Sequence, residues 1–481
     1  MQILRTGSCT LLLKMRLAAA IHPRLSRRDA LSRMAGGFGL LGLTNLLAAT
    51  QNPFDPKPPH FAPKAKRIIY LVLNGGLSQV DSFDPKPSLA KYDGKPMPGS
   101  GPPRTESSTG NLMKSPFAFK RYGQSGIEVS EIFPQIGAAI DKFCVIRSMH
   151  TDVPNHEPSL FMTNCGALQP GRPSLGSWLT YGLGTENRNL PGFVVLCPGT
   201  PVVGPPLWES AFLPAVFQGT YVKNAGTSDP YELIRHIKPG APETVQRRQL
   251  DLLRKFNEDH LADGRRGDSQ LEAAVASMET AFRMQAEAPD AFDIRKESDA
   301  TRARYGDSDF GRGCLMARRL VERGVRMVQM YFGNSQPWDN HEDIHVHRRL
   351  ASQTDPAVAS LVQDLEDRGM LHDTLVILGT EFGRTPAVQN SSTIKLHAGR
   401  DHNSLGYTIL LAGGGVKGGM TYGATDEFGY YAVEKKVHVH DLNATILHLM
   451  GLDHTRLTYR YSGRDFRLTD VHGNVVRDIM A

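Results

Sequence analysis

Six short apolar segments, rich in β-branched and aromatic residues, are spread along this chain, and each ends at glycine or polar residues. They are Arg67–Leu73, Phe143–Ile146, Gly192–Leu196, Val325–Phe332, Thr374–Leu378 and Tyr407–Leu411. A strand whose residues are apolar in an unbroken run is typical of a sheet buried on both faces. We therefore expect these segments to be the strands of one internal sheet.

Helical patterns lie between the strand segments. They cover Ser269–Ala286, Gly313–Arg323 and Asp355–Arg368, and in the first of them Leu271 and Val275 begin an apolar face. Strands that alternate with helices indicate an α/β fold. The chain is thus expected to form a mostly parallel (mixed) sheet sandwiched by helices.

The composition divides the 481 residues into three parts. Residues 1–49 have the features of a signal peptide, and residues 50–66 form a proline-rich linker. We expect residues 67–475 to form the α/β domain, with a charged, mainly helical insertion at about 230–310. Residues 85–130 are rich in glycine and proline and show little periodicity, so they predict a long surface excursion.

A pair of arginines, Arg27 and Arg28, precedes a glycine-rich apolar stretch at residues 34–43, and small residues follow at Ala48 and Ala49. A membrane-spanning helix needs about 20 apolar residues, so this stretch predicts a removable signal and no stable membrane anchor. Twin arginines in this setting indicate export by the twin-arginine translocase. The expected location is the periplasm or the extracellular space.

The charge balance argues against nucleic-acid binding. The chain has 55 basic and 49 acidic residues, but residues 1–49 hold seven of the basic and one of the acidic residues, which leaves 48 of each sign. The mature protein is therefore close to neutral, without the basic surface that binds phosphate backbones. The spacing of Cys144, Cys165, Cys197 and Cys314 matches no zinc or redox pair, and both disulfides and buried thiols are compatible with it.

Ligands of such sheets bind at the carboxyl ends of the strands, so the residues that follow each strand are the candidates for chemistry. Asp339 and His341 follow the fourth segment, and carboxylate and imidazole side chains together are suitable ligands for a divalent metal. We expect the nearby His345 and His347 to lie on a solvated helix start. Glu381 follows the fifth segment as a candidate metal ligand.

Further candidates lie at other strand ends. Arg384 and Arg400 are suited to holding an oxyanion, and His402 lies in a polar loop before the last strand. The first strand is followed by Asn74 and Asp81, a weaker and a stronger metal ligand. The second strand is followed by a polar run that offers a nucleophile or further ligands, with these members: Ser148, Thr151 and His156.

The order of these segments resembles the alkaline phosphatase/sulfatase superfamily, and it is most similar to an exported, sulfatase-like bacterial family known as domain of unknown function 1501. The resemblance covers roughly residues 67–470. These segments carry it: Asn74-Gly75-Gly76, Asp81-Ser82-Phe83-Asp84, Trp338-Asp339-Asn340-His341, Arg368-Gly369-Met370-Leu371, Glu381-Phe382-Gly383-Arg384-Thr385-Pro386, Gly399-Arg400-Asp401-His402 and Asp441-Leu442-Asn443-Ala444-Thr445-Ile446.

The resemblance implies that Asp339, His341 and His402 bind one metal ion. It aligns Glu381 with the Asp of the superfamily's Asp-His-Gly and Asn74 with its first-strand acid. The chain departs from that pattern because Phe382 replaces the histidine and Asn74 is not an acid. A sulfatase nucleophile requires Cys or Ser in a Cys-x-Pro-x-Arg context, and neither residue stands at that place in 153–163.

Two functions follow as hypotheses. The first is a metal-dependent hydrolase of sulfate or phosphate esters that uses a divalent Zn, Ca, Mg or Mn ion bound by Asp339, His341, Glu381, His402, Asn74 and Asp81. Its predicted catalytic residues are Thr151, His156 and Arg384, and attack by activated water is favoured over a covalent intermediate. The second is an inactive superfamily member that binds sulfated or acidic glycans or serves envelope assembly.

Overall fold

The computed structural model describes residues 54–99, 109–234, 237–238, 240–262, 269–389 and 398–481. Its largest feature is a nine-stranded sheet in the order β13-β5-β12-β9-β1-β8-β6-β7, with β16 beside β5. The strands are β1 (Arg67–Val72), β5 (Phe143–His150), β6 (Phe193–Leu196), β7 (Thr220–Val222), β8 (Met327–Tyr331), β9 (Thr374–Gly379), β12 (Tyr407–Ala412), β13 (Met420–Tyr422) and β16 (Val437–His438).

Only β12 runs against its neighbours in this sheet, because it pairs antiparallel with both β9 and β5, whereas the other pairs are parallel. The expected mostly parallel, mixed sheet is confirmed. The central strand β1 explains why: Ile69 and Leu71 enter one hydrophobic core, and Ile68 and Tyr70 enter the core on the other face. An apolar run fits this strand because both of its faces are buried.

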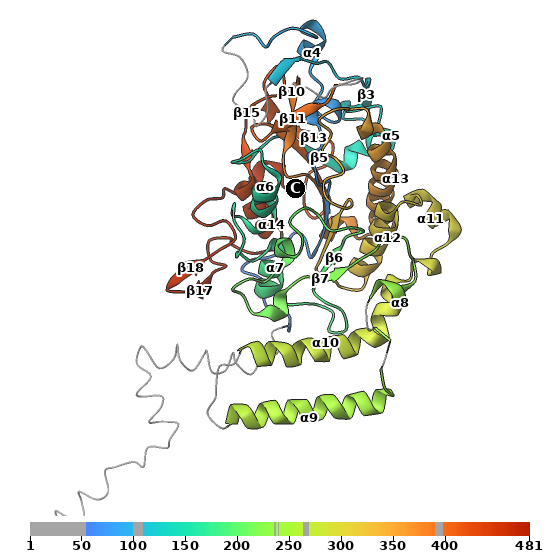
Figure 1. Cartoon of the computed structure of the whole chain (residues 1–481), viewed down its shortest axis with the longest axis vertical. Coiled ribbons are helices and arrows are strands. Elements are labelled where there is room, and N and C mark those ends of the chain that lie inside the picture. Colours follow the sequence, from blue (N-terminus) through green and yellow to red (C-terminus); the bar gives the residue numbers. More distant parts are fainter. Residues whose placement is uncertain (1–53, 100–108, 235–236, 239, 263–268, 390–397) are drawn as a thin grey trace, which may run out of the picture. The chain divides into compact units, whose positions relative to one another are not determined.

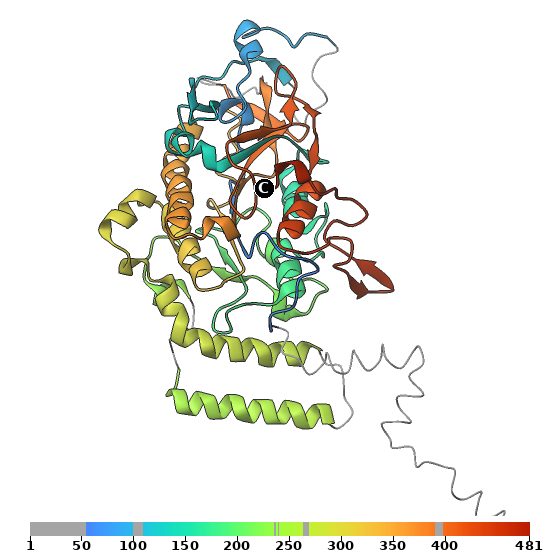
Figure 2. The same ribbon diagram turned by 180° about the vertical axis from the view of Figure 1, so that it is seen from behind.

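Helices cover both faces of the sheet. On one face lie α5 (Pro134–Ala138), α12 (Asp309–Glu322) and α13 (Val346–Asp367). On the other lie α6 (His156–Cys165), α7 (Leu175–Leu183) and α14 (Val439–Leu449), as Figure 1 and the reverse view in Figure 2 show. The sheet is thus sandwiched by helices, as the alternation of patterns predicts.

The region around residues 230–310 is helical where the structure describes it. It contains α8 (Pro230–Leu233), α9 (Glu243–Ala262), α10 (Ser269–Phe292) and α11 (Asp299–Tyr305). In Figures 1 and 2, α9 lies alongside α10. Ion pairs from Arg247 and Arg254 to Glu279 join these two helices. The α10 residues Ala288 and Phe292 are buried in the core that contains Ile69 and Leu71.

A second sheet of three strands, in the order β11-β10-β2, lies at one end of the main sheet. It consists of β2 (Thr109–Leu112), β10 (Gly383–Gln389) and β11 (Arg400–Asn403). The antiparallel register places Arg384 opposite His402. Three two-stranded hairpins complete the fold: β3 (Phe119–Tyr122) with β4 (Ile127–Ser130), β14 (Ala424–Thr425) with β15 (Ala432–Glu434), and β17 (Tyr459–Tyr461) with β18 (Arg464–Phe466).

Several expectations change at the amino-terminal side. The predicted signal, residues 1–49, lies outside the described residues. Residues 57–65 of the predicted linker are bound to the domain, since the backbone N–H groups of Lys57, His60 and Lys64 donate to carbonyls of Leu183, Gly451 and Leu449. Residues 85–130 also include β2, β3 and β4, with β2 paired to β10, so the predicted excursion is partly sheet.

The four cysteines of the described chain are buried free thiols, which settles the alternative between disulfides and thiols in this structure. Among the described residues, no helix combines the length and the apolar character that crossing a membrane requires.

Candidate metal centre

Loops from four strands of the main sheet meet at one edge. Asp339 and His341 follow β8, Glu381 follows β9, and His156 begins α6 after β5. His402 lies on β11, just before β12. Because β12 is antiparallel to its neighbours, its first residues lie at the same edge as the carboxyl ends of the parallel strands, which brings His402 to the other three loops.

Three imidazole rings surround the carboxylate of Asp339. The Nε2 atoms of His341 and His402 lie 2.7 and 3.1 Å from Asp339 Oδ1, and Nε2 of His156 lies 3.3 Å from Oδ2. The side chains of His156 and His402 are buried, whereas Asp339 and His341 are partly exposed. The cluster therefore lies within the protein but is open on the side of Asp339 and His341.

The other ring nitrogen of each histidine is held by an acceptor oxygen. Nδ1 of His156 lies 2.8 Å from Glu381 Oε1, Nδ1 of His402 lies 2.6 Å from the Pro154 carbonyl oxygen, and Nδ1 of His341 meets Gln389 Oε1. A carbonyl or carboxylate oxygen can only accept, so each Nδ1 carries the hydrogen and donates it. A neutral ring in that tautomer presents a bare Nε2 lone pair toward Asp339.

Three lone pairs and a carboxylate that face one another need a positive charge between them. Burial would lower the pKa of His156, but hydrogen bonds with Asp339 and Glu381 outweigh burial and raise this pKa to about 9. Burial would raise the pKa of Asp339, and the three imidazoles and Arg384 instead hold this pKa well below its ordinary value. A proton on His156 supplies the charge here, and a divalent metal ion fits the same place.

The chemistry of the donors is that of a metal centre. Three imidazole nitrogens with one carboxylate oxygen form a set that suits zinc and related ions, and anchored Nδ1 atoms are the usual support of histidine ligands. Donor atoms of His156, Asp339 and His402 lie within 4.8 Å of one another, as do those of His341, Asp401 and His402. His402 belongs to both groups, so it is the central donor of the cluster.

The two predicted oxyanion-binding arginines are sealed inside the protein. Arg384 is 0% exposed, and its guanidinium donates to the Gly75, Gly76 and Trp338 carbonyls and to Asp339. Arg400 is equally buried and donates to Asp81 and to backbone carbonyls. Their donors are used within the protein, so this geometry does not support the predicted oxyanion role.

Asn74 and Asp81 lie apart from the donor groups around Asp339. Asn74 accepts from Phe332 N–H and donates to the carbonyls of Gly333 and Ser335, so it joins two loops. Asp81 is paired with Arg400 at 2.7 Å; burial would raise its pKa, but Arg400 lowers it. Neither side chain is brought to the metal-ligand cluster in this structure.

Thr151 and Ser148 do not form an activated nucleophile here. Thr151 is buried, and its Oγ1 has no hydrogen-bond partner among the described residues. Ser148 Oγ donates to the Lys435 carbonyl. A hydroxyl nucleophile needs a base within hydrogen-bond reach, which neither side chain has among these contacts.

His347 lies at a helix start as expected, because α13 begins at Val346, but the expectation that it is solvated is wrong, since this residue is buried. Its ring packs edge-on against Trp338, and its nitrogens meet Ser78 N–H and the Asn340 side chain. Burial lowers the pKa of His347 to about 3. His345, just before the helix, is exposed as expected.

Gly75 allows two of the loops to approach closely. Its φ of +117° is strained for other residues, and a Cβ there would lie 2.6 Å from Asp339 N. Its own N–H donates to Glu381 Oε1 at 2.8 Å. The glycine after β1 thus brings the backbone of Asp339 against the loop that anchors His156.

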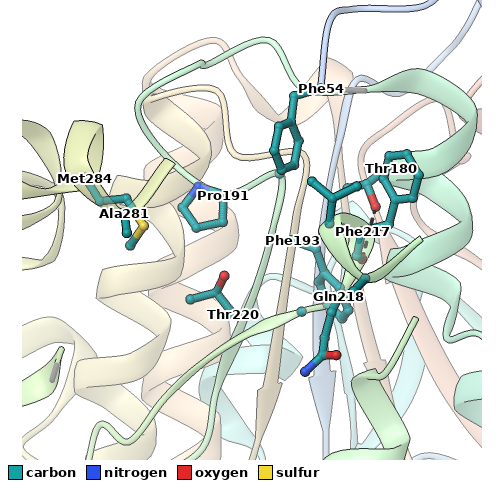
Figure 3. Close-up of a pocket in the computed structure, with 13 residues that line it drawn as sticks. Phe54, Thr180, Pro191, Phe193, Phe217, Gln218, Thr220, Ala281 and Met284 are labelled. Carbon is teal, nitrogen blue, oxygen red and sulfur yellow. Dashed lines mark hydrogen bonds between the residues drawn. The ribbon is translucent and has the colours of Figure 1, made fainter. Parts of the chain in front are cut away.

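A separate cavity of about 420 Å³ lies where β6 begins, at the opposite edge of the sheet. Figure 3 shows Ala281 and Met284 of α10 on one side of it and Thr180 and Phe217 on the other. Its lining contains no titratable side chain. It offers neither metal ligands nor an acid or base, so the Asp339 cluster is the better candidate for chemistry.

The structure brings four of the predicted residues together, namely His156, Asp339, His341 and His402, in an arrangement that the sequence did not predict. His156 was predicted to be catalytic, yet it lies among the ligand atoms. The Pro154 carbonyl and Gln389 were not predicted at all, because a backbone acceptor and a distant amide leave no local signal. Of these residues, Asp401 could most easily have been found from the sequence, because it directly precedes His402. It belongs to the second donor group.

Comparison with known proteins gives a family but no activity. No curated protein sequence matches the chain. Similar solved structures include the PsFucS1 sulfatase from Pseudoalteromonas sp., with 12% identity and a TM-score of 0.35 over 86% of this chain and 70% of that one. The phosphonate monoester hydrolase SpPMH from Silicibacter pomeroyi has 12% identity and a TM-score of 0.32 over 72% and 71%.

TAB5 alkaline phosphatase has 11% identity and a TM-score of 0.30 over 81% of this chain and 99% of its own. Such low values assign no activity to this chain. The family model described as "Protein of unknown function (DUF1501)" matches residues 65–480, which is most of the chain. The chain therefore belongs to the DUF1501 family.

Proposed function

We propose that this protein is an exported, metal-dependent hydrolase of sulfate or phosphate esters. One observation carries the proposal: the Nε2 atoms of His156, His341 and His402 meet at the Asp339 carboxylate, and each Nδ1 is fixed by an acceptor. This arrangement supports a divalent ion bound by the four side chains. Such an ion supplies Lewis-acid polarisation of an ester oxygen and a lowered pKa of water.

The protein's own residues would orient the ligands and admit the substrate. Glu381 and the Pro154 carbonyl hold the Nδ1 hydrogens of His156 and His402, which fixes the direction of both rings. The exposed sides of Asp339 and His341 leave an approach for an ester. Because Arg384 and Arg400 are sealed, substrate charge has to be compensated at the metal centre itself.

The test uses the purified mature chain. We expect it to retain a divalent metal in elemental analysis and to hydrolyse aryl sulfates or aryl phosphates. His402→Ala should lose the metal and the activity together, because His402 belongs to both donor groups. His372→Ala is the matched control, since this side chain is 76% exposed and should change neither. A chain that binds no metal and hydrolyses neither ester class contradicts the proposal.

A second function is favoured by the surroundings of the centre. Phe382 packs against the rings of His156 and His402, with centroids 4.8 and 4.6 Å apart, and so covers one side of the ligands. Together with the sealed arginines, this supports a non-catalytic protein that binds sulfated or acidic glycans or serves envelope assembly. Glycan binding that persists in His402→Ala, without hydrolysis by the parent chain, would favour this function.

Export by the twin-arginine translocase is part of the proposal and rests on Arg27, Arg28 and the apolar stretch behind them. That route carries folded proteins, so a metal ion could be inserted before export. The sulfated or phosphorylated substrate would then be met in the periplasm or outside the cell.

A further inference from the structure

The helix α9 of the insertion exposes an apolar stripe. Val245, Leu252 and Phe256 are 41%, 52% and 60% exposed, although side chains of this kind are mostly buried. They are separated by seven and four residues, which places them in one row along a helix with 3.6 residues per turn. Leu253, beside this row, is exposed as well. A contiguous apolar surface of this kind marks a contact with another molecule.

The opposite side of α9 is the one that contacts α10. Arg247 and Arg254 lie about half a turn around the helix from the stripe, and their guanidiniums pair with Glu279 of α10. An amphipathic helix usually turns its apolar side toward its own core. Here the side that faces α10 carries these ion pairs, so the apolar stripe is directed away from α10.

Charged side chains along one flank of the stripe indicate what covers it. Arg248 comes four residues before Leu252, and Asp259 comes three residues after Phe256. Both charged side chains are exposed and lie on the same side of the stripe. When two copies of α9 lie antiparallel about a two-fold axis perpendicular to them, these like flanks meet. Arg248 of each copy then lies opposite Asp259 of the other, and interhelical pairs of this type fix orientation and register.

The apolar row favours the same register. With Arg248 opposite Asp259, Leu252 of one copy lies within one residue of facing Phe256 of the other, and symmetry repeats both contacts. In a parallel pair each residue would lie level with its own copy, so Arg248 would have no opposite charge across the contact. The apolar and the charged patterns therefore agree on antiparallel pairing.

The overall charge of α9 also favours a second copy over a membrane surface. The helix has four basic and four acidic residues. Helices that lie on anionic membranes are rich in Lys and Arg on their polar face, which this balance does not provide. A partner with equally balanced charge fits better, and a second copy of α9 has that property.

We propose that α9 is a self-association surface through which two copies of this chain form an antiparallel, two-fold dimer. The contact covers Leu252 and Phe256 of both copies and forms the Arg248–Asp259 pair twice. A helix of 20 residues is about 30 Å long, which limits the buried area to the lower end of specific interfaces, so the dimer is reversible. The proposal is independent of the Asp339 centre and of the proposed hydrolase activity.

Sedimentation equilibrium of the mature chain over a range of concentrations tests the pairing. We expect a monomer–dimer equilibrium, and Leu252→Glu should weaken the dimer at least tenfold because it places a charge in the apolar contact. Val471→Glu is the matched control, since it makes the same kind of change at a side chain that is 70% exposed outside α9. This control should leave the equilibrium unchanged.

Charge reversal tests the orientation. Arg248→Glu and Asp259→Arg should each weaken self-association at least tenfold, since like charges then face each other twice. When the two variants are mixed, with one of them fluorescently labelled, they should form a heterodimer, because both pairs then join opposite charges. Recovery of this kind cannot come from a change in folding, since each chain alone stays monomeric.

Three outcomes would overturn the proposal. The first is a mature chain that stays monomeric at every concentration, including one that instead binds vesicles of phosphatidylglycerol. The second is a dimer that neither Leu252→Glu nor the charge reversals weaken. The third is a pair of charge variants that do not recover dimerisation when mixed. None of these outcomes affects the hydrolase proposal, which is tested at His402.

Discussion

At the scale of single residues, Glu381 orients a predicted metal ligand without belonging to the donor groups itself. It is fully buried, accepts from Gly75 N–H and holds His156 Nδ1 at 2.8 Å. Glu381→Gln keeps the shape but removes the charge that orients and polarises the ring. We expect metal affinity to fall about 10–100-fold while the fold is retained, since partners of histidine ligands typically act with that strength.

Competition of the purified variant with a chromophoric chelator measures this change in affinity. Glu157→Gln is the matched control, because Glu157 is adjacent to His156 and exposed to solvent. Equal affinity for the parent, the Glu381 variant and the control would show that Glu381 does not orient a ligand. A lost fold in circular dichroism would instead give Glu381 a structural role.

The role of Arg384 in the structure could not be predicted from its place in the sequence. An arginine after a strand-end acid is suited to bind an oxyanion, and the pattern alone favours that role. In the structure the glycine-rich turn after β1 directs the carbonyls of Gly75 and Gly76 inward, and the buried guanidinium satisfies them. Buried carbonyls require donors, and no local pattern tells which arginine supplies them.

At the scale of elements, Asp355 of α13 holds the start of α5. Its two carboxylate oxygens accept from Gln135 N–H at 2.9 Å and Ile136 N–H at 2.7 Å. Asp355→Ala leaves these two donors without their partners, so we expect a loss of about 1–3 kcal/mol in the free energy of unfolding. Urea denaturation of the variant measures this, with Asp367→Ala, exposed on the same helix, as the control.

The contribution of Asp355 to the free energy of unfolding should also depend on pH. Burial outweighs the two backbone hydrogen bonds and raises its pKa from 3.8 to about 6 in the folded state. The folded state then binds more protons than the unfolded state between pH 3.8 and 6, so stability from this group falls as pH rises through that window. The advantage of the parent over Asp355→Ala should be larger at pH 4.5 than at pH 7.5, and the reverse order would contradict the assigned pKa.

The strands were predicted closely because their apolar runs coincide with the buried sheet, whereas helix starts were less accurate. The predicted Thr374–Leu378 became β9, Thr374–Gly379. The helix expected from Asp355 instead begins at Val346 and contains Pro356 inside it. His347 lies at a helix start as expected, and its burial is what the sequence pattern did not predict.

At the scale of the whole molecule, the centre joins segments that are distant along the chain. His156, Asp339 and His402 come from three separate segments, yet residues 53–481 form one compact unit. The order of strands was not predictable from periodicity, since hydrophobic patterns give the faces of a strand but not its neighbours. The clearest example is β12: because it runs antiparallel to its neighbours, the residues before it, including His402 on β11, lie at the site.

Because the ligands are spread over that unit, an ion bound to them stabilises the folded state as a whole. Binding only to the folded state at a free concentration of 100 times Kd adds about 2.7 kcal/mol to the free energy of unfolding. For a domain of this size we expect chelation to lower Tm by about 3 °C. Differential scanning calorimetry with and without a chelator measures the shift.

The same measurement on variants separates the centre from non-specific effects. His402→Ala should have the lower Tm from the start and should not respond to the chelator, because its loops no longer share an ion. His372→Ala should behave like the parent chain. If the parent loses its metal to the chelator while its Tm stays constant, the ion does not bridge these loops. The three imidazoles around Asp339 would then be held together by the proton on His156 alone, which is the arrangement that the raised pKa of this ring already permits.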